Sequence, residues 1–216
     1  MKLLPIFLVL LLLTGAASAA SAPLNKDVNT PIKSDTTTAN RIGWISTQTI
    51  PVAESSDDDQ LVNGASLNST TALALDPTRT GFLDNPDVPR CLLVTPSDVV
   101  TSTILFTGTD IAGASITEWA NFSASSTAVT TAKAFKTVTR INATTTGTTR
   151  TVKIGTSDKL GLNTKLATNT VLLAALNDTK ESTAPTVTVS STVLSQNTID
   201  TNTAPGGKIT KVWFIV

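Results

Sequence analysis

The densest group of residues that could support chemistry is the run of three aspartates Asp57, Asp58 and Asp59. Hard cations such as calcium bind clustered carboxylate oxygens together with backbone carbonyls. Adjacent side chains alternate in direction, however, and the segment lacks the spaced Asp, Asn and Gly residues of a calcium-binding loop. We therefore interpret these aspartates as a solvated polar loop, and we predict no metal site and no cofactor.

The sequence lacks most of the side chains that usually perform acid–base and nucleophilic catalysis. The chain contains no histidine, which excludes Ser-His-Asp triads, Cys-His pairs and imidazole metal ligands. Glutamate occurs only as Glu54, Glu118 and Glu181, and the spacing of the acidic residues indicates no pair of carboxylates of the kind that glycosidases use. The single cysteine, Cys91, lies in an apolar stretch and is interpreted as a small buried hydrophobe. We predict that the chain is not an enzyme and has no catalytic residues.

Two further residue types could take part in recognition or modification. Trp44, Trp119 and Trp213 could form a carbohydrate platform, but they are far apart in sequence, and we interpret them as core or interface anchors. Asn-x-Ser/Thr glycosylation motifs begin at four positions: Asn68, Asn121, Asn142 and Asn177. We expect these asparagines to accept glycans if the producing cell has the machinery.

The last strand expected in the sequence is apolar on both faces. Val212, Phe214 and Val216 share one face, and Trp213 and Ile215 share the other. Such a strand requires cover on both sides, because an exposed apolar edge promotes aggregation. Burial within the domain and pairing with another subunit both satisfy this requirement. We predict that these five residues form a candidate assembly strand.

The composition predicts an all-β fold. About one residue in five is threonine, a β-branched residue whose hydroxyl suits the solvent face of a two-faced sheet. Lysine plus arginine and aspartate plus glutamate number 16 each, so no basic surface is available for nucleic acid, and we predict no nucleic-acid partner.

The hydrophobic pattern indicates a series of short strands. Alternation in 102–109 and 115–122, around the turn candidate 110–113, predicts a β-hairpin. A strand is expected to begin near 41–45, an irregular stretch covers 76–90, and an apolar segment follows at 92–94. Further strands are predicted at 134–142, 149–155, 169–176, 186–191 and 209–216, with a short helix as the alternative for 169–176. Gly155, Gly161, Gly206 and Gly207 are expected in tight turns. These spacings favour an antiparallel β-sandwich or jelly-roll.

The amino-terminal residues have the three regions of a secretory signal peptide. Lys2 precedes an apolar run from Leu3 to Leu13, and Ala17-Ser18-Ala19 forms a cleavage motif. The run is shorter than a membrane-spanning helix requires, so we predict no stable membrane anchor after cleavage. We expect a signal peptide over 1–19, an extended polar arm over 20–40 and one β-sandwich domain over 41–216. The mature chain is expected outside the cytoplasm.

Several blocks of the sequence from Pro89 onward resemble a family of small virion structural proteins of tailed phages and related prophages. The resembling blocks, in the family's order, are 89–90, 106–113 with 116–118, 133–141, 154–162, 169–172, 183–189, 197–200 and the terminal Ile215-Val216. The resemblance implies a β-rich, non-catalytic component of the particle that decorates or completes the head, or lies in the tail. It supplies no catalytic residues.

Two functions remain open from the sequence. One is a non-enzymatic virion structural protein that binds copies of itself, a capsid lattice protein, or both. The alternative is a secreted cell-surface structural protein or adhesin, such as a surface-layer or filament subunit, in which the polar arm and the terminal strand mediate subunit contacts. A secreted carbohydrate-binding module would need grouped aromatic residues on one face.

Overall fold

The computed structural model describes residues 31–33, 42–67, 73–75, 82–143 and 150–216. Contacts divide the chain into two compact units, residues 1–45 and 46–216. In the first unit, β1 (Pro31–Lys33) pairs antiparallel with the beginning of β2 (Ile42–Ala53), and Pro31 lies opposite Trp44. The expected signal peptide and the rest of the expected arm lie outside the described residues, so both stay predictions.

The described chain is all-β, as the composition predicted, and its strands form three sheets. The β15 sheet has the order β1-β2-β15-β11-β12, with β15 (Lys208–Ile215), β11 (Val171–Leu176) and β12 (Thr179–Lys180). The β10 sheet has the order β13-β14-β10-β5-β8, with β13 (Thr186–Thr188), β14 (Thr198–Asp200), β10 (Thr151–Gly161), β5 (Arg90–Pro96) and β8 (Val129–Phe135), and β3 (Asp57–Ser66) also pairs with β10. The β6 sheet has the order β4-β9-β6-β7, with β4 (Leu73–Leu75), β9 (Thr137–Ala143), β6 (Val100–Thr109) and β7 (Ser115–Ser125). Among the described residues the one helical element is the 3-10 turn η1 (Leu194–Gln196).

A first hydrophobic core fills the space between the β10 sheet and the β6 sheet. It includes Leu92 of β5, Ile154 of β10, Phe106 of β6 and Phe135 of β8, all fully buried. The rings of Phe106 and Phe135 pack edge to face with their centroids 6.2 Å apart, an arrangement that aromatic pairs favour. These two sheets therefore form the sandwich that the strand pattern predicted.

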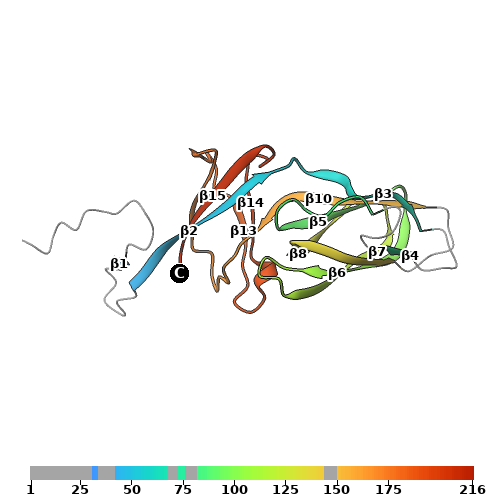
Figure 1. Cartoon of the computed structure of the whole chain (residues 1–216), viewed down its shortest axis with the longest axis horizontal. Coiled ribbons are helices and arrows are strands. Elements are labelled where there is room, and N and C mark those ends of the chain that lie inside the picture. The colour runs from blue at the N-terminus through green and yellow to red at the C-terminus, as the bar shows by residue number, and fades with distance from the viewer. Residues whose placement is uncertain (1–30, 34–41, 68–72, 76–81, 144–149) are drawn as a thin grey trace, which may run out of the picture. The chain divides into compact units, whose positions relative to one another are not determined.

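A second core forms where the β15 sheet packs on the other end of the β10 sheet. Val212 and Phe214 of β15 meet Leu160 of β10 and Ile199 of β14 there, and all four side chains are buried. β10 contributes to both cores, with Val152 and Ile154 in the first and Leu160 in the second. One edge of β10 pairs with β3 and then with β14, and the other edge pairs with β5 (Figure 1).

A buried arginine lies at the beginning of β5, beside the second half of β10. Arg90 is 0% exposed, and it pairs with Leu160 across the strands. Its Nη1 donates to Asp87 Oδ1 at 3.0 Å, and its Nη2 donates to the Glu54 carbonyl at 3.1 Å. Asp87 Oδ2 also accepts from the Glu54 amide at 2.6 Å. This network ties the residue after β2 to the beginning of β5.

The predicted hairpin is confirmed as β6 and β7. Nine registered pairs join the strands, from Val100 opposite Ser125 to Thr109 opposite Ser115. In the turn, Asp110 Oδ1 accepts hydrogen bonds from the amides of Ala112 and Ala114, both at 2.9 Å, and Gly113 adopts a φ of 81°. The turn therefore uses an aspartate that bonds its own backbone and a glycine in the left-handed region.

Five other strand predictions are confirmed, with changed bounds. The segment 169–176 is the strand β11, so the helical alternative is wrong. The strand predicted at 186–191 is shorter, ending at Thr188. The strand expected near 41–45 is β2, the apolar segment 92–94 lies inside β5, and the last strand is β15. Residues 82–89 of the expected irregular stretch contain no strand, whereas Arg90 opens β5.

The single strand predicted at 134–142 is wrong. The strand is interrupted at Lys136. The preceding strand β8 belongs to the β10 sheet, and the following strand β9 belongs to the β6 sheet. The Lys136 amide donates to the Thr109 carbonyl at 2.8 Å. Phe135 and Val138 both enter the first core from the two sides of this crossing. The buried apolar residues Phe135, Val138 and Ile141 are three residues apart, so strict alternation is lost at the break, and the single-strand prediction overlooked this signal.

The loop predicted at the three aspartates and two of the predicted glycine turns are also wrong. Asp57–Ser66 is the strand β3, and Gly155 and Gly161 lie inside β10, which is longer than predicted. A β-carbon at Gly155 would overlap the carbonyl oxygen of Asp57, so glycine lets β3 approach β10 closely. Of the remaining pair, Gly207 has a φ of 71° and does form a turn before β15.

We expect Gly155→Ala to destabilise the chain by roughly 3 kcal/mol or more, because the added methyl group must push β3 away from β10. Gly113→Ala is the matched control, since Gly113 has open space around its Cα and its cost is the left-handed φ alone, about 1–2 kcal/mol. Urea denaturation of both variants measures the difference. Equal losses in the two variants would contradict the close approach.

Candidate assembly surface

The terminal strand lies in the middle of its sheet. β15 is flanked by β2 on one edge and by β11 on the other, so its own backbone edges are already paired within the chain. Val212 and Phe214 are buried in the second core, Trp213 and Ile215 are half-buried, and Val216 is exposed. Burial within the domain therefore covers the face with Val212 and Phe214, while the face with Trp213 and Ile215 is covered only in part. A role of these residues in contacts between copies stays a prediction, and it would use side chains and not the strand edge.

The facing edges of β7 and β8 are closed by a carboxylate. Glu118 Oε1 accepts from the Ala132 amide at 2.6 Å, and Glu118 Oε2 accepts from the Lys133 amide at 2.7 Å. In return, Lys133 Nζ donates to the Thr117 carbonyl at 2.6 Å. β7 and β8 are the end strands of two different sheets. The Glu118 carboxylate therefore takes the place of a neighbouring strand and blocks strand addition at this edge.

The β15 sheet has a more open edge at β11. Its end strand β12 is two residues long, and it pairs only with Ala175 and Leu176 of β11. The amide of Glu181 extends this pairing to the Ala174 carbonyl at 3.0 Å. The preceding part of β11, Val171–Leu173, does not pair with β12, and the Leu172 side chain is 50% exposed.

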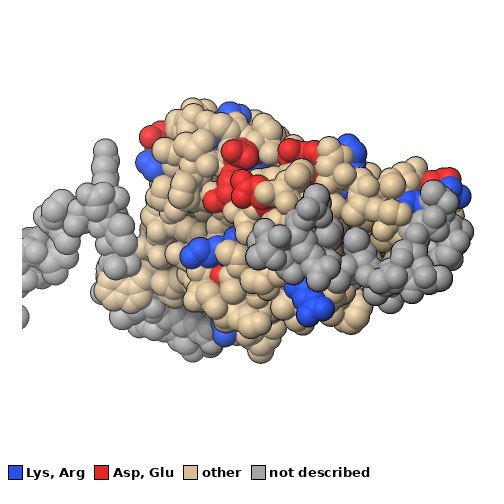
Figure 2. All heavy atoms as spheres, turned by 45° about the vertical axis from the view of Figure 1, so that its right-hand side comes forward, with Lys and Arg blue, Asp and Glu red and all other residues tan. Residues whose placement is uncertain are grey.

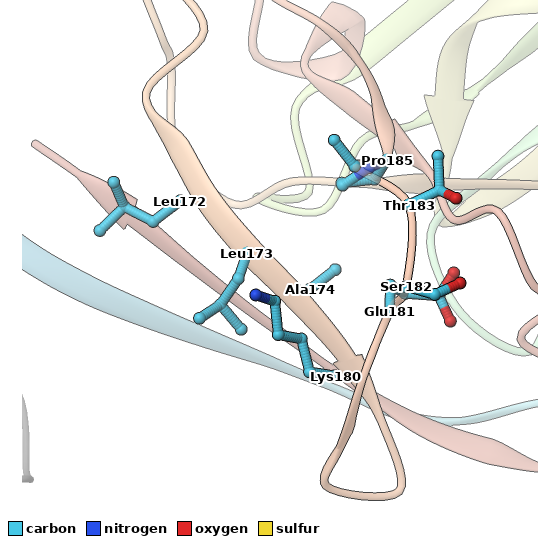
Figure 3. Close-up of a pocket in the computed structure, with 9 residues that line it drawn as sticks. Leu172, Leu173, Ala174, Lys180, Glu181, Ser182, Thr183 and Pro185 are labelled. Carbon is cyan, nitrogen blue, oxygen red and sulfur yellow. The ribbon is translucent and has the colours of Figure 1, made fainter.

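A shallow pocket of about 180 Å³ lies beside this edge. Leu172, Leu173 and Ala174 of β11 form one wall, and the segment 180–185 that leaves β12 forms the other (Figure 3). The buried Glu181 is held in place because its Oε2 accepts from the Thr203 amide at 2.9 Å. A two-residue turn joins β11 to β12, and its residues Asn177 and Asp178 have φ values of 48° and 63°. An apolar side chain of an added segment could fit in this pocket.

The β11 pocket contains one residue of each charge, Lys180 and Glu181, among its lining residues. On the face in Figure 2, acidic residues gather in the upper middle, basic residues lie around them, and residues of other types cover most of the described surface. The sequence has equal numbers of acidic and basic residues. Recognition at the β11 pocket would depend mainly on backbone pairing and apolar contact.

The three adjacent aspartates lie at the beginning of β3 with their carboxylate oxygens within 4.8 Å of one another. Lys153 of β10 forms ion pairs with two of them: its Nζ lies 3.4 Å from Asp58 Oδ2 and 3.2 Å from Asp59 Oδ2. The hydrogen bond from Lys153 lowers the pKa of Asp59, and the same contact raises the pKa of Lys153. A lysine thus lies where a cation would bind, and we assign no metal to this cluster.

Cys91 is fully buried, as the sequence predicted. Burial raises the pKa of its thiol to about 12, so the thiol stays protonated at physiological pH. Ser157 Oγ donates to the Cys91 carbonyl at 3.1 Å, which helps to fix β5 against β10. Cys91 therefore serves in packing, and it lacks the thiolate that nucleophilic chemistry needs.

The tryptophans occupy different elements. Trp44 lies in the first unit, while Trp119 of β7 and Trp213 of β15 belong to different sheets of the second unit. Trp44 and Trp119 are 43% and 55% exposed, so the core alternative is wrong for both and their role as interface anchors stays a prediction, whereas Trp213 is half-buried. Trp119 and Trp213 do not form a shared aromatic platform of the kind a carbohydrate-binding module needs.

The four glycosylation motifs lie in different settings. Asn68 is outside the described residues. Asn121 is exposed on β7, and Asn142 is half-buried on β9, where its Oδ1 accepts from Arg140 Nε at 3.1 Å. Asn177 lies in the β11–β12 turn, and its Oδ1 accepts from the Ile209 amide at 2.9 Å. Whether glycans are attached stays a prediction.

The chain matches no protein-family model, no curated protein and no solved structure. In the part of the chain that the structure describes, no helix has the length and apolarity that a membrane crossing requires. The function proposed below therefore depends on the residues and geometry of the chain itself.

We expect Glu118→Ala to lower the free energy of unfolding by about 1–2 kcal/mol, because two amides of β8 lose a charged acceptor. Glu118→Gln keeps one carbonyl oxygen and should lose less. Chemical denaturation measures both variants, and light scattering should detect association of the alanine variant at its opened edge. Wild-type stability in Glu118→Ala would show that the carboxylate is not the closing element.

Proposed function

We propose that the chain is a non-enzymatic structural subunit that acts through protein–protein contacts with further copies of itself. The observation that carries this proposal is the pocket between β11 and the segment 180–185, where β12 no longer pairs with β11 and Leu172 is half-exposed. An extended segment of a second copy would add to Val171–Leu173 by backbone hydrogen bonds and place an apolar side chain beside Leu172. The contrast with the edges of β7 and β8, where Glu118 blocks addition, supports the choice of this edge.

The favoured setting of this subunit is a virion, as a decoration protein, a minor head protein or a tail component. This part of the proposal is supported by the ordered blocks from Pro89 onward that resemble small virion structural proteins. Several of these blocks lie at structural junctions of the fold. The block 106–113 contains the β6–β7 turn, 133–141 contains the crossing between sheets at Lys136, and 154–162 contains the part of β10 that joins the two cores. A capsid lattice protein is the second partner in this setting.

The alternative setting is the cell surface, as a surface-layer or filament subunit or an adhesin. The signal-peptide pattern of Lys2, the apolar run 3–13 and Ala17-Ser18-Ala19 supports this alternative. The same β11 contact would serve there, because strand addition joins subunits irrespective of the assembly they build. The two settings differ in where the chain is found.

For the contact itself, we expect Leu172→Asp to weaken self-association at least about tenfold, since it removes an apolar side chain and puts a charge at the contact. Multi-angle light scattering after size-exclusion chromatography, over a range of concentrations, measures the mass. Leu83→Asp is the matched control, because Leu83 is a similarly exposed leucine outside the pocket. A monomeric wild-type chain at the highest concentration, or an unchanged mass for Leu172→Asp, would refute the contact.

For the setting, we expect antibodies against the chain to label purified virus particles from the producing culture at many regular positions. Immunogold electron microscopy of particles and of washed cells measures this directly. Labelling confined to cell envelopes would favour the cell-surface alternative and refute the virion setting. This experiment does not depend on the β11 contact, so the two parts of the proposal can fail separately.

A further inference from the structure

The outer face of β7 presents a tryptophan and a glycosylation motif side by side. Ala120 and Phe122 point into the first core and are buried, whereas Trp119, Asn121 and Ser123 are exposed. Alternate residues of a strand share a face and lie about 7 Å apart. The acceptor asparagine and the serine of its motif are therefore on the same exposed row as the Trp119 indole.

The strand register brings a second motif onto the same face. Leu105 of β6 lies opposite Trp119 of β7 and opposite Asn142 of β9. Neighbouring strands are about 4.8 Å apart, so Asn142 lies about 10 Å from Trp119 across the sheet. Thr103 lies opposite Asn121 in the neighbouring row. The motifs at 121 and 142, separate in sequence, thus flank one exposed tryptophan.

The glycosylation motifs on the described residues differ in how exposed the asparagine is and in whether a hydrogen bond already holds its side chain. Asn142 is half-buried on a strand that pairs on both sides, and its Oδ1 is bonded to Arg140. Asn177 is exposed, but its Oδ1 is used to hold the β11–β12 turn against Ile209. Asn121 is exposed on β7, an end strand of its sheet. Asn121 is therefore the best-presented acceptor beside an aromatic ring.

We propose that Asn121 carries an N-linked glycan whose first sugar residues pack on the indole of Trp119. Asn121 Nδ2 forms a bond to C1 of the first sugar while the bond from C1 to the pyrophosphate of a lipid-linked oligosaccharide breaks. The amide loses one proton, the lipid pyrophosphate leaves, and nothing is oxidised or reduced. Pyranose rings have an apolar C–H face that covers an exposed indole, and the exposed Ser123 lies in the same row for the polar edge of the sugar.

The site is tested on the full chain placed behind a secretion signal of a host cell that performs N-glycosylation, so the result does not depend on the chain's own export. Mass spectrometry of glycopeptides from the secreted protein measures occupancy at each motif. We expect Asn121 to be occupied in most molecules, and Ser123→Ala to abolish occupancy there while keeping the asparagine. An empty Asn121 in the secreted protein would overturn the proposal, whether the other motifs are occupied or not.

The packing on Trp119 is tested by a double-mutant cycle of wild type, Ser123→Ala, Trp119→Ala and the double variant. In the glycosylated protein, Ser123→Ala should lower the melting temperature by roughly 2–4 °C, and it should have no such effect when Trp119 is already alanine. Trp44→Ala, which removes another exposed tryptophan, should leave the effect of Ser123→Ala unchanged. The same cycle in unglycosylated protein from bacterial cytoplasm should show no coupling. Equal effects of Ser123→Ala with and without Trp119 would overturn the packing.

Discussion

The strand β10 is the constraint on which the rest of the structure depends, because it is shared by both hydrophobic cores. Its first half places Val152 and Ile154 between the β10 and β6 sheets, and its second half places Leu160 against the β15 sheet. Strands pack against β10 so closely that Gly155 and Gly161 have no room for a side chain. Neither core is complete without this strand, so we infer that the two cores fold together.

The region between the cores is polar, and that determines how the sheets can be joined. Arg90 is withdrawn from water there, and a buried guanidinium is tolerated only when acceptors surround it. Asp87 and the Glu54 carbonyl are the acceptors for Nη1 and Nη2, while Nε has no hydrogen-bond partner, so the segment after β2 must come to the beginning of β5. An apolar contact at this point could slide, whereas directed hydrogen bonds fix one arrangement. We infer that Arg90 specifies the joint between the β15 sheet and the β10 sheet.

The fold class, most strands and the β6–β7 hairpin could be predicted from the sequence because they depend on local patterns. Threonine alternating with Ile104 and Phe106 determines which face of β6 is buried, and Asp110 with Gly113 determines the turn. The crossing at Lys136 was missed although alternation is interrupted between Phe135 and Val138, and such an interruption does not show which sheet the chain enters next. The strand at Asp57–Asp59 was missed for a related reason. Two of its three charges pair with Lys153, which is distant in sequence and reaches them only through the pairing of β3 with β10.

Features of the candidate sites could likewise be predicted where they depend on neighbouring residues, and could not be predicted where they depend on contacts distant in sequence. Burial of Cys91 could be read from its apolar neighbours, but the exposure of Trp119 depends on which face of β7 the core covers. Likewise, the sequence alone could not show that both edges of β15 are paired within the chain, or that the second core buries Val212 and Phe214 but leaves Trp213 and Ile215 half-buried. The open edge is at β11 instead, where a turn at Asn177-Asp178 limits β12 to two residues. A subunit that assembles specifically needs such an edge in one place and blocked edges elsewhere. The Glu118 carboxylate provides a blocked edge in this chain, and the short β12 provides an open one.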